Sequence, residues 1–244
     1  ICEAAQRPSM RFVPVKTEEQ QAAAVVFRGR DLLVRQRTQI SNSIRGHMTE
    51  YGWIAPKGLA HLSKLSALLD DPHAMPQGAR SILMILLDQI KVLDRQIAIL
   101  DKEIARRARE DETARRLMTI PGIGPITATA ITALAPPPGS FAKGRDFAAW
   151  VGLTPRQHST GGKQKLGAIS KMGERTLRRL LIIGSSAVVL QACKRGAPEG
   201  SWLEQMLARK PRMLVTVALA NKTARIVWAL LTGEEVYKAP VAAA

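Results

Sequence analysis

Aromatic side chains are scarce in this sequence, since Phe, Trp and Tyr together make up 4% of its 244 residues. This scarcity argues against a β-sandwich, and against a protein that binds single strands by stacking bases on rings. Cysteine is rarer still, and Cys2 and Cys193 have no Cys or His companions at metal-ligand spacing. We therefore expect reduced thiols in a cytoplasmic protein, with no zinc or haem site.

Long apolar runs are also lacking. The longest, residues 180–190, is interrupted by Gly184 and two serines and is too short to cross a bilayer. The first residues do not resemble a signal peptide. The sequence therefore predicts no membrane partner.

Acidic residues are few relative to basic ones. Twenty Asp and Glu face thirty-six Lys and Arg, which leaves a net charge of +16. A charge this positive predicts a polyanionic partner, with nucleic acid favoured over a membrane surface. Apolar residues make up 46% of the chain, enough for a folded core.

Helical patterns dominate what is present, so we expect a mostly all-α fold. Thr17 and Gln20 form a capping box at the start of a helix that runs to about Tyr51. Only residues 10–15 alternate as a short edge strand would, with Pro14 restricting the pairing.

The clearest periodic signal lies between Ser81 and Arg109. Apolar residues recur there at alternating spacings of three and four, which is the pattern of a coiled-coil seam. It predicts a long helix packed either against the helix of residues 17–51 or against a second copy of the chain. The seam comprises Leu83, Leu86, Ile90, Leu93, Ile97, Leu100 and Ile104.

Residues 119–134 combine a helix end, the segment Pro-Gly-Ile-Gly and a new helix, which is typical of a helix-hairpin-helix. Gly122 and Gly124 would let the backbone approach a phosphate closely. Free N–H groups at the start of the second helix would then bind that phosphate without reading sequence. The alternative is a tight turn that packs two helices and contacts no DNA.

A basic loop and helix start fill residues 156–179. Ser159 and Thr160 stand together before Gly161-Gly162, and Glu174 is the only acid among seven cations. A nucleophilic hydroxyl held close to a phosphate backbone would use all of these features; an ordinary solvated surface is the alternative. His158 is the one histidine in this segment, and we expect it to be a hydrogen-bonding loop residue rather than a general base. The cations are Arg156, Lys163, Lys165, Lys171, Arg175, Arg178 and Arg179.

Three segments carry a resemblance to one family: TIPGIGPITATAITAL, FAAWVGLTPRQHSTGGKQKLGAISKMGERTLRRLLI and MRFVPVKTEEQQA. They resemble the DEDD-type insertion-sequence transposases, the IS-one-ten group, which are related to the pilin-gene invertase and described as bridge-RNA-guided serine recombinases. The resemblance covers nearly the whole chain. It implies DNA as a partner, a structured guide RNA as a further candidate, and a coiled coil that joins protomers into a homo-oligomer.

The same resemblance implies a division into three parts. Residues 1–16 would be the remnant of an upstream RuvC-like domain, residues 17–110 the coiled-coil region, and residues 111–244 the C-terminal transposase domain. The family's RuvC-like domain binds Mg²⁺ through four acidic residues, which we expect upstream of Ile1. We therefore expect no cofactor in this chain, and a truncated transposase whose cleavage activity is lost.

In that family a serine next to glycine attacks the DNA phosphate and forms a covalent intermediate. Here Thr160 stands immediately before Gly161, with Ser159 one residue earlier. The β-branch of threonine restricts how its oxygen is presented, so both hydroxyls remain candidates. The other candidate function is a non-catalytic helix-hairpin-helix module that binds DNA or RNA, and a weaker one is a structural scaffold.

Overall fold

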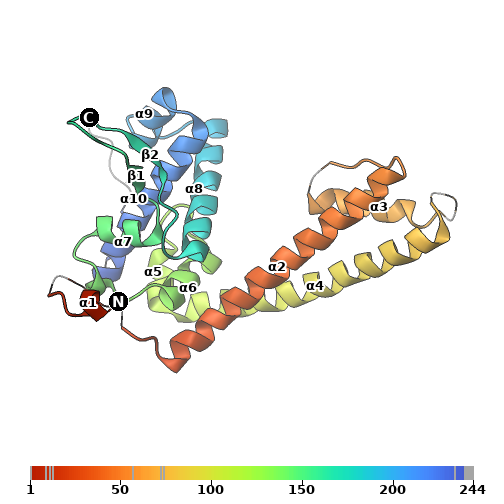
Figure 1. Cartoon of the computed structure of the whole chain (residues 1–244), viewed down its shortest axis with the longest axis horizontal. Helices are drawn as coiled ribbons and strands as arrows, with labels where there is room; N and C mark the ends of the chain where they lie inside the picture. Colours follow the sequence, from red (N-terminus) through yellow and green to blue (C-terminus); the bar gives the residue numbers. More distant parts are fainter. Residues whose placement is uncertain are drawn as a thin grey trace. The chain divides into compact units, whose positions relative to one another are not determined.

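The computed structural model describes residues 2–8, 10, 12, 14–56, 58–71, 73, 75–233 and 235–238. Helices dominate these residues, as predicted, and the one sheet among them has two strands (Figure 1). The chain forms two compact units: residues 22–103, called here the arm, and a second unit of residues 1–21 and 104–244. The three-part division expected from the sequence stays a prediction.

Two long helices build the arm. These are α2 (Glu18–Glu50) and α4 (Gln77–Glu110), with η1 (Leu59–His61) and α3 (Leu62–Leu68) between them. Arg30 forms an ion pair with Asp101, and Arg37 forms one with Asp94. The paired positions advance by one heptad along α2 and retreat by one heptad along α4, so the helices run antiparallel (Figure 1).

The predicted heptad seam faces α2 within the same chain. Leu83, Ile90, Leu93 and Ile97 are buried in the arm, while the seam residue Leu86 is half-buried. Of the two partners left open by the sequence, α4 therefore uses this seam for α2. A coiled coil between two copies of the chain stays a prediction.

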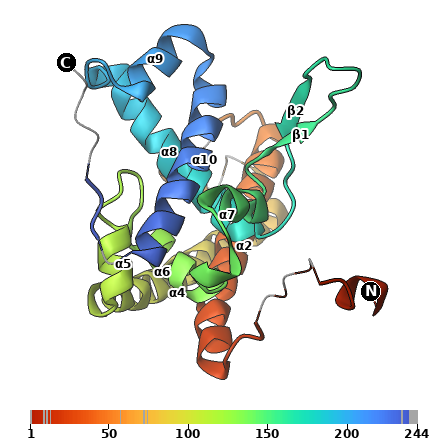
Figure 2. The same cartoon turned by 90° about the vertical axis from the view of Figure 1, so that its left-hand side faces the viewer.

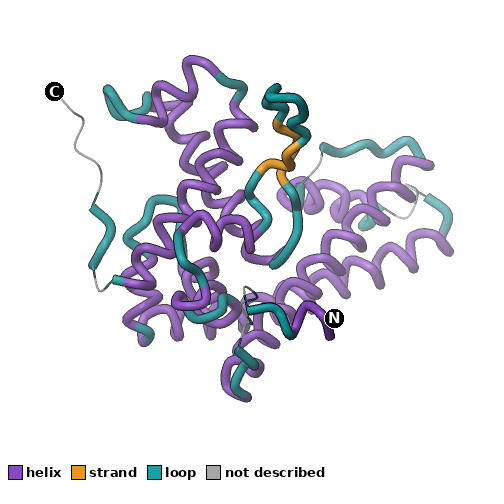
Figure 3. The backbone as a smooth tube through the Cα atoms, turned by 60° about the vertical axis from the view of Figure 1, so that its left-hand side comes forward, coloured by secondary structure: helices purple, strands orange, loops and turns teal. Residues whose placement is uncertain are grey.

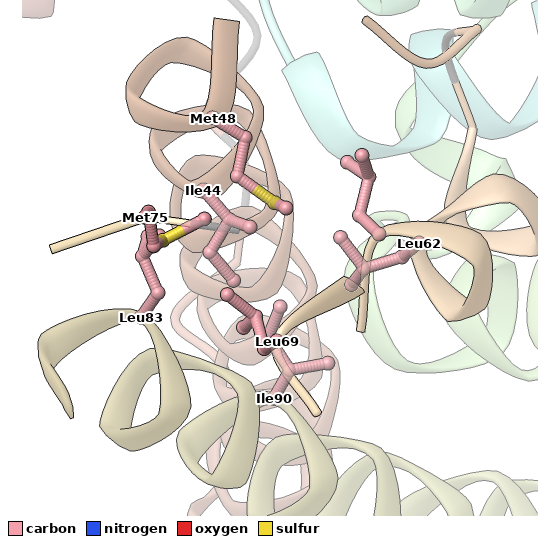
Figure 4. Close-up of a cluster of buried hydrophobic side chains, with 8 residues drawn as sticks. Ile44, Met48, Leu62, Leu69, Met75, Leu83 and Ile90 are labelled. Carbon is pink, nitrogen blue, oxygen red and sulfur yellow. The ribbon is translucent and has the colours of Figure 1, made fainter. Parts of the chain in front are cut away.

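One apolar cluster closes the end of the arm where α3 lies. Ile44 and Met48 of α2 meet Leu62 and Leu69 from the α3 segment, and Leu83 and Ile90 of α4 complete the contact (Figure 4). Ile44 and Met48 are fully buried. Burying such side chains stabilises a fold by about 1.5–3 kcal/mol each, so this cluster is a main source of the arm's stability.

The second unit is a stack of helices around α8 and α10. These two helices pack side by side, and α7 and α9 lie against α10 (Figure 2). The pair α5 and α6 contacts α10 through α5 and α8 through α6. The helices are α1 (Cys2–Ala5), α5 (Glu112–Leu117), α6 (Pro125–Leu134), η2 (Pro138–Ser140), α7 (Gly144–Val151), α8 (Arg175–Arg195), α9 (Trp202–Arg209) and α10 (Arg212–Thr232).

Local signals explain several of these helix ends. Asp111 caps α5 and Ser201 caps α9, each accepting a hydrogen bond from a backbone N–H three residues on. Thr17 and Gln20 exchange the two bonds of the predicted capping box before α2. Such caps satisfy helix-end N–H groups that have no partner within the helix.

Two sequence-based expectations fare differently here. The strand expected at residues 10–15 falls partly outside the described residues, at Arg11 and Val13, and the described ones among them form no strand.

Helices α8 and α10 are each 21 residues long and apolar enough to cross a membrane by length and composition. Packed core helices of soluble proteins pass the same test, so these two helices are only weak evidence for a span.

Candidate nucleic-acid interface

The predicted basic loop is a β-hairpin. Strands β1 (Pro155–Gln157) and β2 (Leu166–Ile169) pair antiparallel (Figure 3). An isolated bridge joins Thr160 to Lys163 beyond them. Gly161 and Gly162 form the turn with φ angles of 55° and 75°. Two positive φ angles define a type I′ turn, whose twist matches that of paired strands and which glycine adopts without strain.

The hairpin register sorts its side chains onto two faces. Gln157 pairs with Leu166 and Thr160 with Lys163, so His158 lies opposite Lys165. Because cross-strand partners share a face and neighbours alternate, one face carries a threonine, a histidine and three cations. We call this the cationic face: Arg156, His158, Thr160, Lys163 and Lys165.

Gly167 supports this assignment. A Cβ at this position would lie 2.8 Å from Cδ2 of His158, so the imidazole occupies the space that a larger residue would fill. His158 and Gly167 therefore share the cationic face, as the register requires. From the sequence alone His158 is expected to be a hydrogen-bonding loop residue, because the strand pairing that places it opposite Lys165 is visible only in the structure.

The two candidate hydroxyls differ in their surroundings. Ser159 lies on the opposite face, where its Oγ accepts a hydrogen bond from the backbone N–H of Lys165 at 2.9 Å. Thr160 makes backbone hydrogen bonds in both directions with Lys163, and its side chain is exposed. The Ser159 hydroxyl thus supports the hairpin, whereas the Thr160 side chain stands among the cations.

The chain enters and leaves the hairpin through two touching segments, which we call the neck: Trp150–Gly152 and Met172–Gly173. Gly152 and Gly173 have φ angles of 82° and 73°. A Cβ on Gly152 would lie 2.0 Å from the carbonyl oxygen of Met172, and one on Gly173 would lie 1.7 Å from that of Trp150. Only glycine fits either position, a requirement that the sequence analysis missed.

Arg178 belongs to the neck rather than to the surface. Its side chain is buried, and Nη1 donates to the carbonyl oxygens of Val151 and Met172, each at 2.8 Å. Arg156 makes a longer bond from Nη2 to the carbonyl oxygen of Ser170, at 3.3 Å. Two of the cations that were expected to contact phosphate, Arg178 and Arg156, therefore donate hydrogen bonds to backbone carbonyl oxygens of the same chain.

The remaining cations lie on or near the outside of this region. Lys163, Lys165, Lys171 and Arg175 are exposed, and no carboxylate in the described part of the chain pairs with any of them. Arg179, one turn into α8, is half-buried. Unpaired exposed cations keep their full attraction for an anion.

The turn between α5 and α6 places its two glycines in different settings. Gly122 has φ 86°, and a Cβ there would lie 2.7 Å from the carbonyl oxygen of Gly184 in α8. Its close backbone approach is therefore to a helix of the same unit. Gly124 is the N-cap of α6, is exposed, and has no atom within 4 Å of a built Cβ. The helix-hairpin-helix assignment stays a prediction, with Gly124 the better placed of the two to meet a ligand.

The acidic, thiol and imidazole side chains of the described residues do not gather into a metal site. Among the described residues, no group of three His, Cys, Asp or Glu side chains is close enough to hold a metal ion. These residues therefore do not fit the magnesium site that the family resemblance implies, and no chemistry is assigned to a metal here.

One lysine of α10 lies in a partly buried setting. Lys222 of α10 lies over the ring of Trp202, 4.6 Å from its centroid. Burial, and then the charge of Arg225, lower the pKa of Lys222 below its usual value of 10.5. This lysine serves packing between α9 and α10, and it is not part of the cationic face.

Known proteins that are similar to this chain are transposases. A family described as "Transposase IS116/IS110/IS902 family" matches residues 114–198, which include the hairpin and its neck. A probable family 20 transposase of Pseudomonas aeruginosa is 46% identical over 98% of this chain and 71% of its own length. The transposase for insertion sequence element IS1328 of Yersinia enterocolitica is 39% identical over 97% of this chain and 71% of its own.

A further relative, the transposase for insertion sequence element IS1111A of Coxiella burnetii, is 36% identical over 98% of this chain and 66% of its own length. These similarities extend through both compact units and confirm the resemblance inferred from the sequence. The chain belongs to the IS116/IS110/IS902 family of insertion-element transposases.

Proposed function

We propose, against the expectation of an inactive truncated chain, that Thr160 of this chain is joined to DNA during transposition of an insertion element. The observation that carries the proposal is the shared face of the hairpin, on which Thr160 stands with Arg156, Lys163 and Lys165. A phosphodiester drawn to these cations would lie against the Thr160 hydroxyl. The exposed cations Lys171 and Arg175 extend the same positive region toward α8.

The chemistry is a transesterification. Oγ1 of Thr160 forms a bond to phosphorus, one P–O bond to a deoxyribose oxygen breaks, and the leaving oxygen takes a proton from water. The hydroxyl proton of Thr160 passes to water. Charge on the phosphoryl oxygens grows in the transition state, and preorganised cations at the reacting centre offset it. Reversal of the same exchange would join the new strand and release the threonine.

Thr160 is favoured over Ser159 for two reasons. Ser159 Oγ is engaged with the N–H of Lys165, on the face that lacks the cations. Thr160 is exposed and directly precedes the two-glycine turn at the tip of the hairpin, so its side chain can be reached by a DNA duplex. The β-branch that restricts the Thr160 rotamer would then help to hold its oxygen in one direction.

The start of α6 supports a second contact with the DNA backbone. Gly124 is exposed and is the N-cap of α6; Pro125 has no N–H, so the donors offered to a phosphate are the N–H groups of Gly124 and Ile126. This contact would be independent of sequence. Gly122 is left out of this contact because its backbone already meets Gly184.

Homo-oligomer formation is part of the proposal, through a seam different from the predicted one. Ile85, Val92 and Ile99 recur at heptad spacing on α4, and Ile85 and Ile99 are 64% and 66% exposed. The seam of Leu83 and Ile90 is used by α2, so a second copy of the chain would pack on this outer seam instead.

Trapping the covalent adduct tests the catalytic proposal. The chain is mixed with a supercoiled plasmid that carries the element's ends, with and without the element's own RNA, then denatured and mapped by mass spectrometry. We expect an adduct on Thr160, its loss in Thr160→Ala, and its retention in Ser159→Ala. Affinity for a short DNA duplex should be equal in both variants.

The outcomes separate the candidate functions. An adduct on Ser159, or one that survives Thr160→Ala, would refute the assignment of the nucleophile. Salt-sensitive DNA binding without any adduct would refute the catalytic proposal and favour the non-catalytic binding module. Adduct formation only when RNA is added would identify the guide RNA as a required partner.

A further inference from the structure

Arg178 is the most deeply placed cation of the region that the proposed function assigns to DNA. It is 9% exposed, whereas its neighbour Arg175, one turn earlier on α8, is exposed. Arginine is almost never fully buried unless its donors are satisfied. Here Nη1 donates to the carbonyl oxygens of Val151 and Met172, one in each of the two segments of the neck.

The neck has little other means of holding its two segments together. Lys171 N donates to the carbonyl oxygen of Gly152 at 3.2 Å, and Ser170 N donates to that of Thr154 at 2.8 Å. Beyond these bonds the backbones touch at Gly152 and Gly173, where neither segment has a side chain to interdigitate. A charged donor shared by two carbonyls is stronger than a neutral hydrogen bond, and burial strengthens it further.

The same contact fixes the hairpin to a rigid element. Arg178 lies in the first turn of α8, which is packed along α10 and is 21 residues long. Its guanidinium therefore connects both ends of the hairpin to the core of the unit. The entering segment has a second anchor, because Leu153 is buried and its carbonyl oxygen accepts a hydrogen bond from Nδ2 of Asn221 in α10 at 3.3 Å. Arg178 differs from that anchor in reaching both the entering and the leaving segment.

We infer that Arg178 is a positioning residue for the Thr160 hairpin and that it does not contact DNA phosphate. This inference rests on the proposed function for the role of the hairpin, but the link between Arg178 and the neck stands on the hydrogen bonds alone. Arg178 sets the direction in which the cationic face points, while Lys163, Lys165 and Arg175 supply the attraction for DNA.

Hydrogen exchange on the free chain tests the link directly. Arg178→Met keeps the length of the side chain and removes its donors, and Arg175→Met is the matched control on the same helix. In Arg178→Met we expect exchange at the Ser170 and Lys171 amides to accelerate about tenfold or more, because a hydrogen bond to a charged group contributes about 1.5–3 kcal/mol. Arg175→Met and the amides in the middle of α8 should not change.

Salt titration of binding to a short DNA duplex tests the role. A phosphate contact contributes about 0.9 to the slope of log affinity against log salt concentration. We expect Arg175→Met to lower the slope by roughly that amount, and Arg178→Met to leave the slope unchanged while adduct formation falls. A lower slope in Arg178→Met, with unchanged exchange at the neck, would overturn the inference.

Arg178→Lys covers the case in which Arg178→Met does not fold. Lysine keeps the charge, so a phosphate contact would tolerate it, but its shorter side chain draws the donor back from the two carbonyl oxygens that Nη1 of Arg178 reaches. We expect faster exchange at the neck in this variant with an unchanged salt slope, and unchanged exchange would overturn the inference. If the unmodified chain binds no DNA, the proposed function fails, yet the exchange result still decides whether Arg178 holds the neck.

Discussion

The arm and the hairpin both carry many cations, but their cations have different partners. In the arm, Arg30 and Arg37 of α2 are paired with aspartates of α4, and both side chains are about one-fifth exposed. On the hairpin, Lys163 and Lys165 are exposed and have no carboxylate partner in the described part of the chain. Within one molecule, a high density of positive charge can therefore reflect either ion pairs inside the protein or cations left exposed to solvent.

The difference shows how a basic sequence should be interpreted. Regularly spaced arginines on α2 match aspartates one heptad apart on α4, so their charge is neutralised within the arm. The charge of the hairpin has no such counterpart among residues 156–179, because Glu174 is the one acid in that segment and it caps α8 by accepting from the N–H of Thr176. The unpaired cations, rather than the total charge, mark the surface for a polyanion.

Replacing glycine by alanine should give the largest difference in stability change between the two units. In Gly184→Ala the new Cβ would lie 1.9 Å from the carbonyl oxygen of Gly122. Because backbone cannot yield as a side chain does, we expect a loss of about 3 kcal/mol or more in the stability of the second unit. Gly46→Ala in α2 meets no atom within 4 Å and should stabilise the arm by about 0.5–1 kcal/mol.

Calorimetry combined with exchange of amides in each unit measures both effects. The relevant amides are those of α8 and of α2. A Gly184→Ala variant as stable as the unmodified chain would contradict the close approach of the two backbones.

Removing charge should change DNA binding only where the cations are unpaired. Lys165→Gln is expected to lower the salt slope of DNA affinity by about 0.9, or roughly 1 kcal/mol of binding at moderate salt. Arg37→Gln should leave the slope unchanged and weaken only the contact with Asp94, which contributes about 0.2–1 kcal/mol to the arm. Equal slopes for the two variants would remove the distinction between arm and hairpin.

Lys222 offers a smaller test within the second unit, because its cation is partly desolvated. Its pKa is lower in the folded chain than in the unfolded chain, so the unfolded chain binds more protons as pH approaches 10.5. Stability should therefore rise with pH as the folded Lys222 loses its proton. Thermal unfolding from pH 8 to pH 10 should show this rise, and Lys222→Met should reduce it; an identical pH profile in both proteins would argue against the desolvation.

The outer seam of α4 should give the smallest change in stability. Ile99 is 66% exposed, so Ile99→Lys should alter the stability of the isolated chain by no more than about 0.5 kcal/mol. It should nevertheless shift the chain toward monomer if a second copy packs on this seam. Sedimentation of Ile99→Lys beside Arg95→Gln, a polar change on the same helix, measures the shift, and an unchanged assembly would exclude this seam.

Sequence patterns predicted the arm better than the site. The heptads of α4 require only a regular apolar repeat, and that repeat survives in the fold as a buried seam. The hairpin was missed because β1 and β2 have little of the β-branched, alternating character of strands, and because their lysines and glycines are typical of loops. The one available signal was Gly161-Gly162 between two segments of similar length, a hairpin pattern.

The roles of individual glycines and arginines depend on contacts between distant residues. Gly122 was expected to approach a phosphate and instead meets Gly184, sixty-two positions later in the sequence. Arg178 was grouped with the surface cations because nothing local distinguishes it from Arg175 and Arg179. Such distinctions arise only when the chain has folded and a helix face has a neighbour.

Helix α8 carries both of these contacts on one continuous rod. Arg178 and Gly184 are six residues apart, about 9 Å along the axis at the usual helical rise. One end of this rod is joined to the neck of the hairpin, and its middle rests on the turn that precedes α6. A force that displaces the α5–α6 turn would therefore also move the Thr160 hairpin, because the stiff helix α8 connects the two and no flexible loop lies between them to absorb the displacement.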